Sequence, residues 1–157
     1  MKARIAILTV VVAALAMINV GARQTAAPAA AKAPDTTLMK SAMFTWEALK
    51  VEETKIGARR GVVRAPTATL DEFESHITTL NVGQQSHAPH THPNEEIIIL
   101  KEGTCEAYIN GVWTPMSTGS MAFFASNVPH AIRNVGKTPA TYHVVNWTGL
   151  GQMKKTQ

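Results

Sequence analysis

The chain has 157 residues, enough for one domain with a single core and little besides. It carries 15 lysines and arginines against 11 acidic residues, for a formal net charge of +4. Nucleic-acid-binding proteins gather basic residues on one face, whereas here only Arg59-Arg60 and Lys154-Lys155 stand together, so we expect no nucleic-acid partner and interpret both pairs as solvated surface.

The first residues have the pattern of a secretory signal peptide. Lys2 and Arg4 precede an apolar run from Ile5 to Val20, and Val20-Gly21-Ala22 offers small or modest residues where a signal peptidase cuts. The alternative is an uncleaved membrane anchor, but this run has 16 residues and a membrane-spanning helix needs roughly 20. We therefore predict a signal peptide over residues 1–22, an exported protein that is periplasmic or secreted, and no membrane association after cleavage.

Residues 23–42 are rich in alanine and proline at their start, which predicts a linker. Between Leu38 and Leu49 the apolar residues fall at a spacing close to helical. This segment is predicted to be either a short N-terminal helix packed on the outside of the domain or an arm that reaches a partner subunit. The single folded domain is expected over residues 43–152, followed by a C-terminal tail at 153–157.

Short segments rich in β-branched and aromatic residues follow, separated by turn residues, and no long helix is indicated. Asn110-Gly111 is a strong signal for a two-residue hairpin turn. Cys105 is the only cysteine, so no intramolecular disulfide can form, and we interpret it as a small buried hydrophobe. The pattern favours an all-β sandwich or barrel. The predicted strands are Phe73–Leu80, Glu95–Lys101, Thr104–Ile109, Met121–Ala125, His130–Val135 and Thr141–Trp147.

One predicted strand contains Ile97-Ile98-Ile99-Leu100 and is apolar on both faces. Such a strand is covered on both sides. One side would face the interior, and the other would face a second layer or a subunit interface, so we expect a homodimer. Met121 and Phe123 are interpreted as core residues, with the wall of a pocket as the alternative.

Residues 90–96 hold two imidazoles and a carboxylate. His90 and His92 are two apart, so on a strand both point to one face. Glu96 has the same parity, but a straight strand would carry it about 13 Å beyond His92. Pro93-Asn94 resolves this, because both residues favour a turn that lets the chain double back. His130 is a fourth candidate, and imidazole with carboxylate is a donor set that first-row transition metals prefer.

The spacing of these residues resembles the two sequence motifs of the cupins, over about residues 61–150. The first motif is matched by Gly83-x6-His90-x-His92-x3-Glu96-x6-Gly103, and the second by Gly119-x5-Ala125-x-Asn127-x2-His130-x3-Asn134. The first has six residues instead of the usual five before its histidine pair. In the second, Ala125 replaces the usual proline and Asn127 the usual glycine. Asparagine tolerates the left-handed conformation that glycine would supply, so the turn before His130 is expected to survive.

This resemblance implies an all-β fold, a small cupin-type jelly-roll β-barrel, with a metal near its centre held by His90, His92, Glu96 and His130. The cofactor would be a divalent transition metal, and the sequence does not choose among manganese, iron, nickel, copper and zinc. Parity and motif spacing both favour Glu96 over Glu95, which is expected to point outward. Cupins carry out dioxygenation, isomerisation, decarboxylation or hydrolysis, some members only bind ligands, and they commonly dimerise.

Three interpretations of the function compete. The leading one is a metalloenzyme of dioxygenase, isomerase or hydrolase type that acts on a small, oxygen-bearing organic molecule, with Glu96 as the candidate catalytic residue. The alternative is an exported cupin that binds a small ligand without turnover. A third interpretation is a dimeric stability element with a vestigial site. His76, His87 and His143 are interpreted as ordinary residues, and Asn134 as one that ties down a loop.

Overall fold

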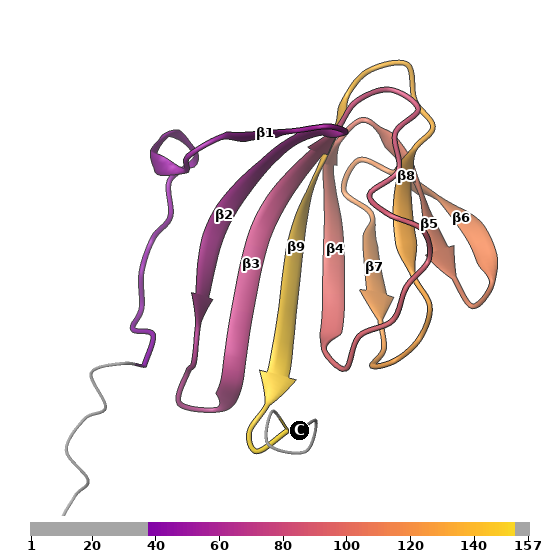
Figure 1. The fold of residues 1–157 in the computed structure, drawn as a ribbon. Coiled ribbons are helices and arrows are strands. Elements are labelled where there is room, and N and C mark those ends of the chain that lie inside the picture. The colour runs from indigo at the N-terminus through magenta and orange to yellow at the C-terminus, as the bar shows by residue number, and fades with distance from the viewer. Residues whose placement is uncertain (1–37, 153–157) are drawn as a thin grey trace, which may run out of the picture. The chain divides into compact units, whose positions relative to one another are not determined.

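The computed structural model describes residues 38–152, and almost all of this part is β-structure. The predicted signal peptide, the linker as far as residue 37 and the C-terminal tail lie outside the described residues. Two antiparallel sheets form the domain (Figure 1). The larger has the order β1 (Glu52–Thr54), β2 (Gly57–Ala65), β3 (Leu70–Leu80), β9 (Ala140–Gly149), β4 (Glu95–Glu102), β7 (Met121–Phe124). The smaller has the order β6 (Val112–Ser117), β5 (Thr104–Ile109), β8 (Ala131–Asn134).

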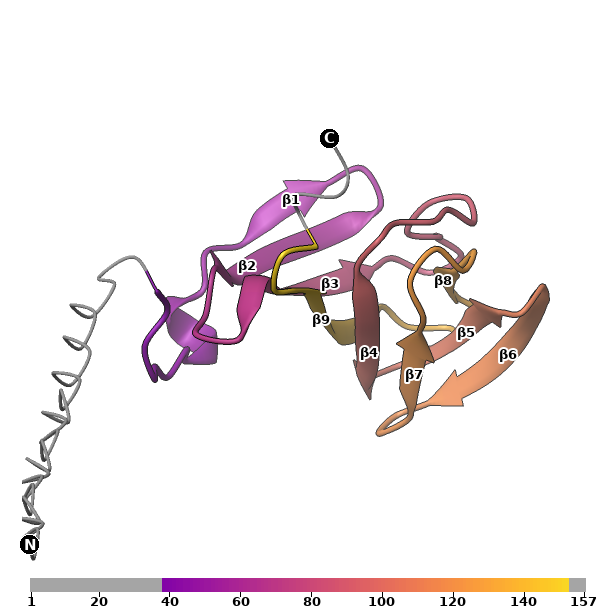
Figure 2. The same cartoon turned by 90° about the horizontal axis from the view of Figure 1, so that it is seen from below.

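The smaller sheet lies beside the β4–β7 end of the larger one, as Figures 1 and 2 both show. Neighbours that are distant in sequence, such as β9 between β3 and β4, give the jelly-roll topology that was predicted. The core lies between the sheets, and every strand around it contributes alternate side chains. Its buried members are Leu80, Ile98, Leu100, Cys105, Ala107, Met116, Ala122, Phe124, Ile132, Ala140, Tyr142 and Val144.

The two faces of β4 meet different surroundings. Ile98 and Leu100 point inward and are buried, whereas Ile99 on the outer face is 37% exposed. Next to it on β7, Met121 and Phe123 also face outward and are 64% and 51% exposed. The interpretation of Met121 and Phe123 as core or pocket wall was therefore wrong. Alternation identifies which residues share a face, but strand pairing decides which face is inside.

The six predicted strands are all present within a few residues, whereas β1, β6 and β2 were not among the predicted strands. The longest of these three is β2. Its first half, Gly57-Ala58-Arg59-Arg60-Gly61, combines glycine with charged residues, both of which are poor signals for a strand. Pairing with β3 along the whole of β2 overrides this weak preference. Tertiary contact also changes the meaning of the arginine pair, since Arg60 stacks on Trp46 and Arg59 pairs with Glu74.

The segment from Leu38 to Leu49 forms only the 3-10 turn η1 (Trp46–Ala48), so the predicted short helix is absent from the described residues. Thr45, at its start, provides no side-chain cap. Phe44, Trp46 and Leu49 lie against the outer face of the larger sheet instead, whereas Met43 is 88% exposed. Trp46 lies under Arg60 and Lys101, with each cation 4.6 Å from its ring centre. Packing on the sheet thus replaces the contacts along a helix.

Two asparagines adopt the left-handed conformation at the predicted turns. Asn110 has φ 50° and Gly111 has φ 86°, which is the two-residue hairpin between β5 and β6. Asn127 has φ 59°, so it supplies the conformation that glycine provides in the motif. Asn134 ties down a loop as predicted, because its buried amide donates to the carbonyl oxygens of Leu80 and Thr138.

Candidate metal centre

Two loops bring three histidines together inside the domain. The backbone N–H of His90 donates to the carbonyl of His130 at 3.2 Å, and the N–H of His130 donates back to His90 at 3.0 Å. The N–H of Asn127 donates to the carbonyl of His92 at 2.8 Å. These bonds fasten the segment around residues 90–92 to the turn that precedes β8, so the positions of the rings do not depend on side-chain packing alone.

Each of the three imidazoles has its Nδ1 beside a backbone carbonyl oxygen. The partners are the carbonyls of His130 for His90 at 3.3 Å, Asn94 for His92 at 2.9 Å and Val128 for His130 at 2.8 Å. A carbonyl can only accept, so Nδ1 carries the proton and Nε2 presents a lone pair. Metal-binding histidines are oriented by the same kind of bond in other proteins.

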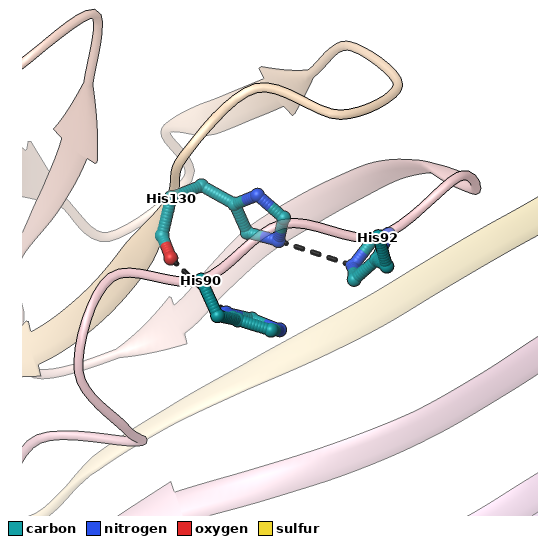
Figure 3. Close-up of side chains that lie close together, drawn as sticks. All are labelled: His90, His92 and His130. Atoms are coloured by element: carbon teal, nitrogen blue, oxygen red, sulfur yellow. Dashed lines mark hydrogen bonds between the residues drawn. The ribbon is translucent and has the colours of Figure 1, made fainter.

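The geometry of the three rings fits a metal ion. Nε2 of His92 lies 3.1 Å from Nε2 of His130 (Figure 3), and one ligand atom from each of the three histidines lies within 4.8 Å of the others. Two bonds of about 2.1 Å to one cation place their nitrogen atoms roughly 3.0–3.4 Å apart. Two lone pairs facing at such a distance repel unless a proton or a cation lies between them. His90, His92 and His130 could therefore hold a metal ion.

Burial favours the neutral ring that a metal requires. His130 is 2% exposed, and its ring lies against that of Phe124 with centres 4.6 Å apart. Burial lowers the pKa of His130, the bond to the Val128 carbonyl opposes this, and the neighbouring histidines lower it further. An imidazole that stays neutral keeps its lone pair available for a metal at neutral pH.

Glu96 lies next to the three histidines but not within the same tight cluster. Its carboxylate oxygens are 3.6 Å from Nε2 of His92 and 3.8 Å from Nε2 of His130. The chain bends at Pro93 and Asn94 before β4 begins, as expected, and the Asn94 amide donates to the Thr148 hydroxyl at 2.7 Å. Ligation by Glu96 and its catalytic role stay predictions.

The neighbouring Glu95 points to the outer face, as predicted. Its carboxylate accepts a hydrogen bond from Trp147 Nε1 at 3.0 Å, and these two residues are paired across β4 and β9. The adjacent glutamates therefore face opposite sides of one sheet, and only Glu96 belongs to the interior.

Burial of Glu96 should make the folding stability of the metal-free protein fall as the pH rises. Burial raises the pKa of Glu96 from 4.5 to about 7. As the pH rises, the Glu96 carboxyl group therefore loses its proton in the unfolded chain before it does so in the folded protein. Folding is favoured most below pH 4.5, and this advantage is lost as the pH rises toward 7. The Glu96→Gln variant should lack this fall, which amounts to at most about 3 kcal/mol. Denaturation with urea at pH 5 and pH 8, in the presence of a chelator, measures it.

The matched control for this prediction is Glu95→Gln, on the outer face of the same strand. This control should retain the pH dependence of the native protein. Any other group that titrates between pH 5 and pH 8 is present in all three proteins, so only the difference between variants is informative. Parallel pH curves for native and Glu96→Gln protein would contradict the prediction.

A cavity of about 340 Å³ extends from the three histidines across the inner face of the larger sheet. His87 lies at this cavity, with its ring centre 3.8 Å from that of His90. The cavity is also lined by polar residues that were not predicted, among them Arg59, His76 and Asn146. The alternation of polar residues at 74, 76 and 78 was the available signal. It indicated a polar face but not that this face is the inner one.

Comparison with known proteins agrees with this arrangement. A family model described as "Cupin domain" matches residues 76–146, which include all four predicted ligands. Residues 76–146 are therefore a cupin domain. No curated protein sequence matches this cupin. Among solved structures, 245 chains match it.

Three solved structures illustrate the likeness in fold. An RmlC-like cupin from Shewanella frigidimarina has a TM-score of 0.58 at 14% identity, covering 73% of this chain and 96% of its own. A predicted oxalate decarboxylase from Thermotoga maritima has a TM-score of 0.55 at 17% identity, covering 68% of this chain and 99% of its own. A sugar phosphate isomerase from Silicibacter pomeroyi has a TM-score of 0.54 at 20% identity, covering 68% of this chain and 75% of its own. At these identities the likeness shows the cupin fold.

Proposed function

We propose that this cupin is a metalloenzyme that acts on a small, oxygen-bearing organic molecule. The observation that carries the proposal is the convergence of three oriented imidazoles on one end of a cavity, with the Glu96 carboxylate beside them. The cofactor would be manganese, iron, nickel, copper or zinc, held by His90, His92 and His130, with Glu96 as the fourth ligand. When bound, such a cation polarises a substrate oxygen or activates water or dioxygen.

The remaining residues of the site have separate roles in this proposal. The backbone carbonyls that bond to Nδ1 keep the three rings in place, so binding requires little reorganisation. The cavity of about 340 Å³ has the size of a small-molecule site and limits the substrate to a compact molecule. Glu96 is also the candidate for moving a proton at the substrate.

The competing proposal is a cupin that captures a small ligand without converting it. To distinguish the two, the protein is loaded with each metal in turn and incubated with small acids, sugars and phenols, with and without oxygen. Loss of a substrate only when the metal is present, measured by mass spectrometry and oxygen uptake, would support the enzyme. A ligand that is retained tightly and recovered unchanged would support the binder and overturn the enzyme.

We further propose that the protein works outside the cytoplasm, in the periplasm or secreted. The support is the pattern of residues 1–22, with its two basic residues and apolar run. Within residues 38–152, no helix is long and apolar enough to cross a membrane. Cell fractionation of an epitope-tagged protein, with N-terminal sequencing of the exported form, tests both export and the position of cleavage.

We also propose a homodimer that forms through the outer face of β4, β7 and β9. Ile99, Met121 and Phe123 are exposed there, and the Phe123 ring stacks on Trp147 at 6.5 Å. An exposed apolar strip of this kind marks an interaction site. The native protein should therefore have twice the chain mass in light scattering, and Phe123→Lys should be monomeric at the same concentration.

The control for the homodimer is Val112→Lys. Val112 is 62% exposed, but it lies on β6 in the other sheet. This variant should remain dimeric, because it adds the same charge away from the proposed interface. Monomeric native protein at micromolar concentration would contradict the proposal.

A further inference from the structure

A second cluster of ionisable groups faces the same cavity from β3. Nδ1 of His76 lies 2.9 Å and 3.1 Å from the two carboxylate oxygens of Glu74. Glu74 is 3% exposed and also accepts hydrogen bonds from Arg59 Nη2 at 3.1 Å and Asn146 Nδ2 at 2.9 Å. A buried carboxylate with three donors is a built arrangement, and the proposed metal site does not use it.

The bonds to Glu74 determine where the protons are. Burial alone would raise the pKa of Glu74, but the hydrogen bond and charge of His76, with the charges of Arg59 and Arg64, outweigh burial and lower it. The ionised carboxylate can only accept, so Nδ1 of His76 must carry the hydrogen. In the neutral form of His76, which is the form that can accept a proton, Nε2 presents its lone pair, and the residue lines the cavity. A histidine oriented in this way by a carboxylate is an effective proton acceptor.

The strand register places this pair opposite the three histidines. Glu74, Asn146 and Glu96 are direct neighbours across β3, β9 and β4. Adjacent strands are about 4.8 Å apart, so the backbones at Glu74 and Glu96 are separated by roughly 10 Å. The side chains of Glu74, Asn146 and Glu96 all lie on the inner face of the sheet. His76 shares that face of β3 with Glu74 and lines the cavity that the three histidines also line. His76 can therefore reach one end of a substrate whose other end lies at the three histidines.

We propose that His76 removes a proton from carbon in a 2-hydroxyaldehyde or 2-hydroxyketone bound in this cavity. This inference rests on the proposed function, because adjacent carbonyl and hydroxyl oxygens are the groups that would meet the metal. The C–H bond next to the carbonyl breaks, and its proton goes to Nε2 of His76. Its electron pair forms a carbon–carbon double bond, and the carbonyl π pair moves to oxygen. The proton on Nε2 exchanges with solvent, and return of a proton to the same carbon gives back the substrate. Its return to the former carbonyl carbon, with the hydroxyl proton passing to the former carbonyl oxygen, gives the isomer, so no oxidant or reductant is needed.

Glu74 is a positioning residue in this step. It fixes the His76 tautomer and stabilises the imidazolium that forms when Nε2 takes the proton. Arg59 and Asn146 hold Glu74 in turn, and the Arg59 side chain is 40% exposed against 4% for Glu74. The carboxylate therefore stays ionised and oriented, and Glu74 itself does not line the cavity as His76 does.

Hydrogen exchange at carbon tests the proposal directly. The metal-loaded protein is incubated in deuterium oxide with dihydroxyacetone, glyceraldehyde, xylulose and fructose, and NMR follows deuterium entering the carbon next to the carbonyl. The native protein should catalyse this exchange for at least one probe. His76→Gln should lower the rate at least about 100-fold, the usual contribution of a general base. Glu74→Gln should lower kcat for exchange by about 10-fold or more with KM little changed, since it does not touch the probe.

The control variant is His143→Gln. His143 lies on the neighbouring strand β9 and faces the outer side of the sheet near Ile77, so its removal should leave exchange unchanged. Circular dichroism and metal content are measured for every variant, so misfolding and metal loss are recognised. A native protein that binds no metal overturns the proposed function and the inference with it. A native protein that binds metal and exchanges no probe, or a folded His76→Gln variant that exchanges normally, overturns the inference alone.

Discussion

Replacing His90 and His92 together with alanine is expected to abolish stoichiometric metal binding. Only His130 and Glu96 would remain at the site, and their nearest ligand atoms are 3.8 Å apart. Loss of a hydrogen-bond partner of a metal-binding residue already lowers affinity about 10–100-fold, so we expect removal of two ligands to cost more than about 1,000-fold. Equilibrium dialysis against zinc and manganese, with elemental analysis of the retained metal, measures the loss.

His143→Ala is the matched control for this prediction, because it removes an imidazole from the outer face of the same domain. It should retain the metal content of the native protein. The double variant should keep its β-structure, because His90 and His92 are fastened mainly by backbone bonds that alanine preserves. Equal metal in native and double-variant protein, whether high or negligible, would contradict a metal site at these histidines.

Gly103→Ala is expected to cost about 3–5 kcal/mol of folding free energy. Gly103 joins β4 to β5 with φ +93°, and a methyl group there would lie 2.6 Å from Cβ and 2.7 Å from Cα of Ala140. Ala140 is fully buried at the start of β9 and cannot move aside. The cost combines steric overlap in a packed core with about 1–2 kcal/mol for the left-handed backbone. Urea denaturation of native and variant protein measures it.

Gly119→Ala separates the two contributions. Gly119 also has a left-handed backbone, with φ +85°, but a methyl group there would meet no described atom within 4 Å. Its expected cost is therefore about 1–2 kcal/mol, from the backbone alone. If Gly103→Ala and Gly119→Ala lost the same stability, close approach to Ala140 would not be the reason that the first motif has glycine at position 103.

The sequence predicted the strands best where β-branched residues are dense. β4 and β5 were found almost to the residue, and the hairpin between β5 and β6 follows from Asn110-Gly111 because few other pairs accept positive φ at both positions. β2 was missed, since it is stabilised by pairing with β3 rather than by its own composition. The helical spacing between Leu38 and Leu49 was misleading, because Trp46 and Leu49 lie against the larger sheet while Met43, at the same spacing, is 88% exposed.

The candidate site divides in the same way. His90, His92 and His130 were predicted from their spacing, which is short-range information that one motif carries in a few residues. His76 was not predicted as a site residue, although it belongs to a predicted strand. Nothing local distinguishes it from His143, and the two point to opposite faces only because of the register between β3 and β9.

By itself, the sequence determined an all-β cupin domain and the histidines that meet at the candidate metal site, since turns, strand periodicity and motif spacing are properties of neighbouring residues. Only the tertiary structure decided which face of each strand is inside. It put Met121 and Phe123 on the surface and set the Glu74–His76 pair across a cavity from the three histidines. The physical reason is that alternation leaves the two faces of a strand equivalent until another strand pairs with it and one face is buried.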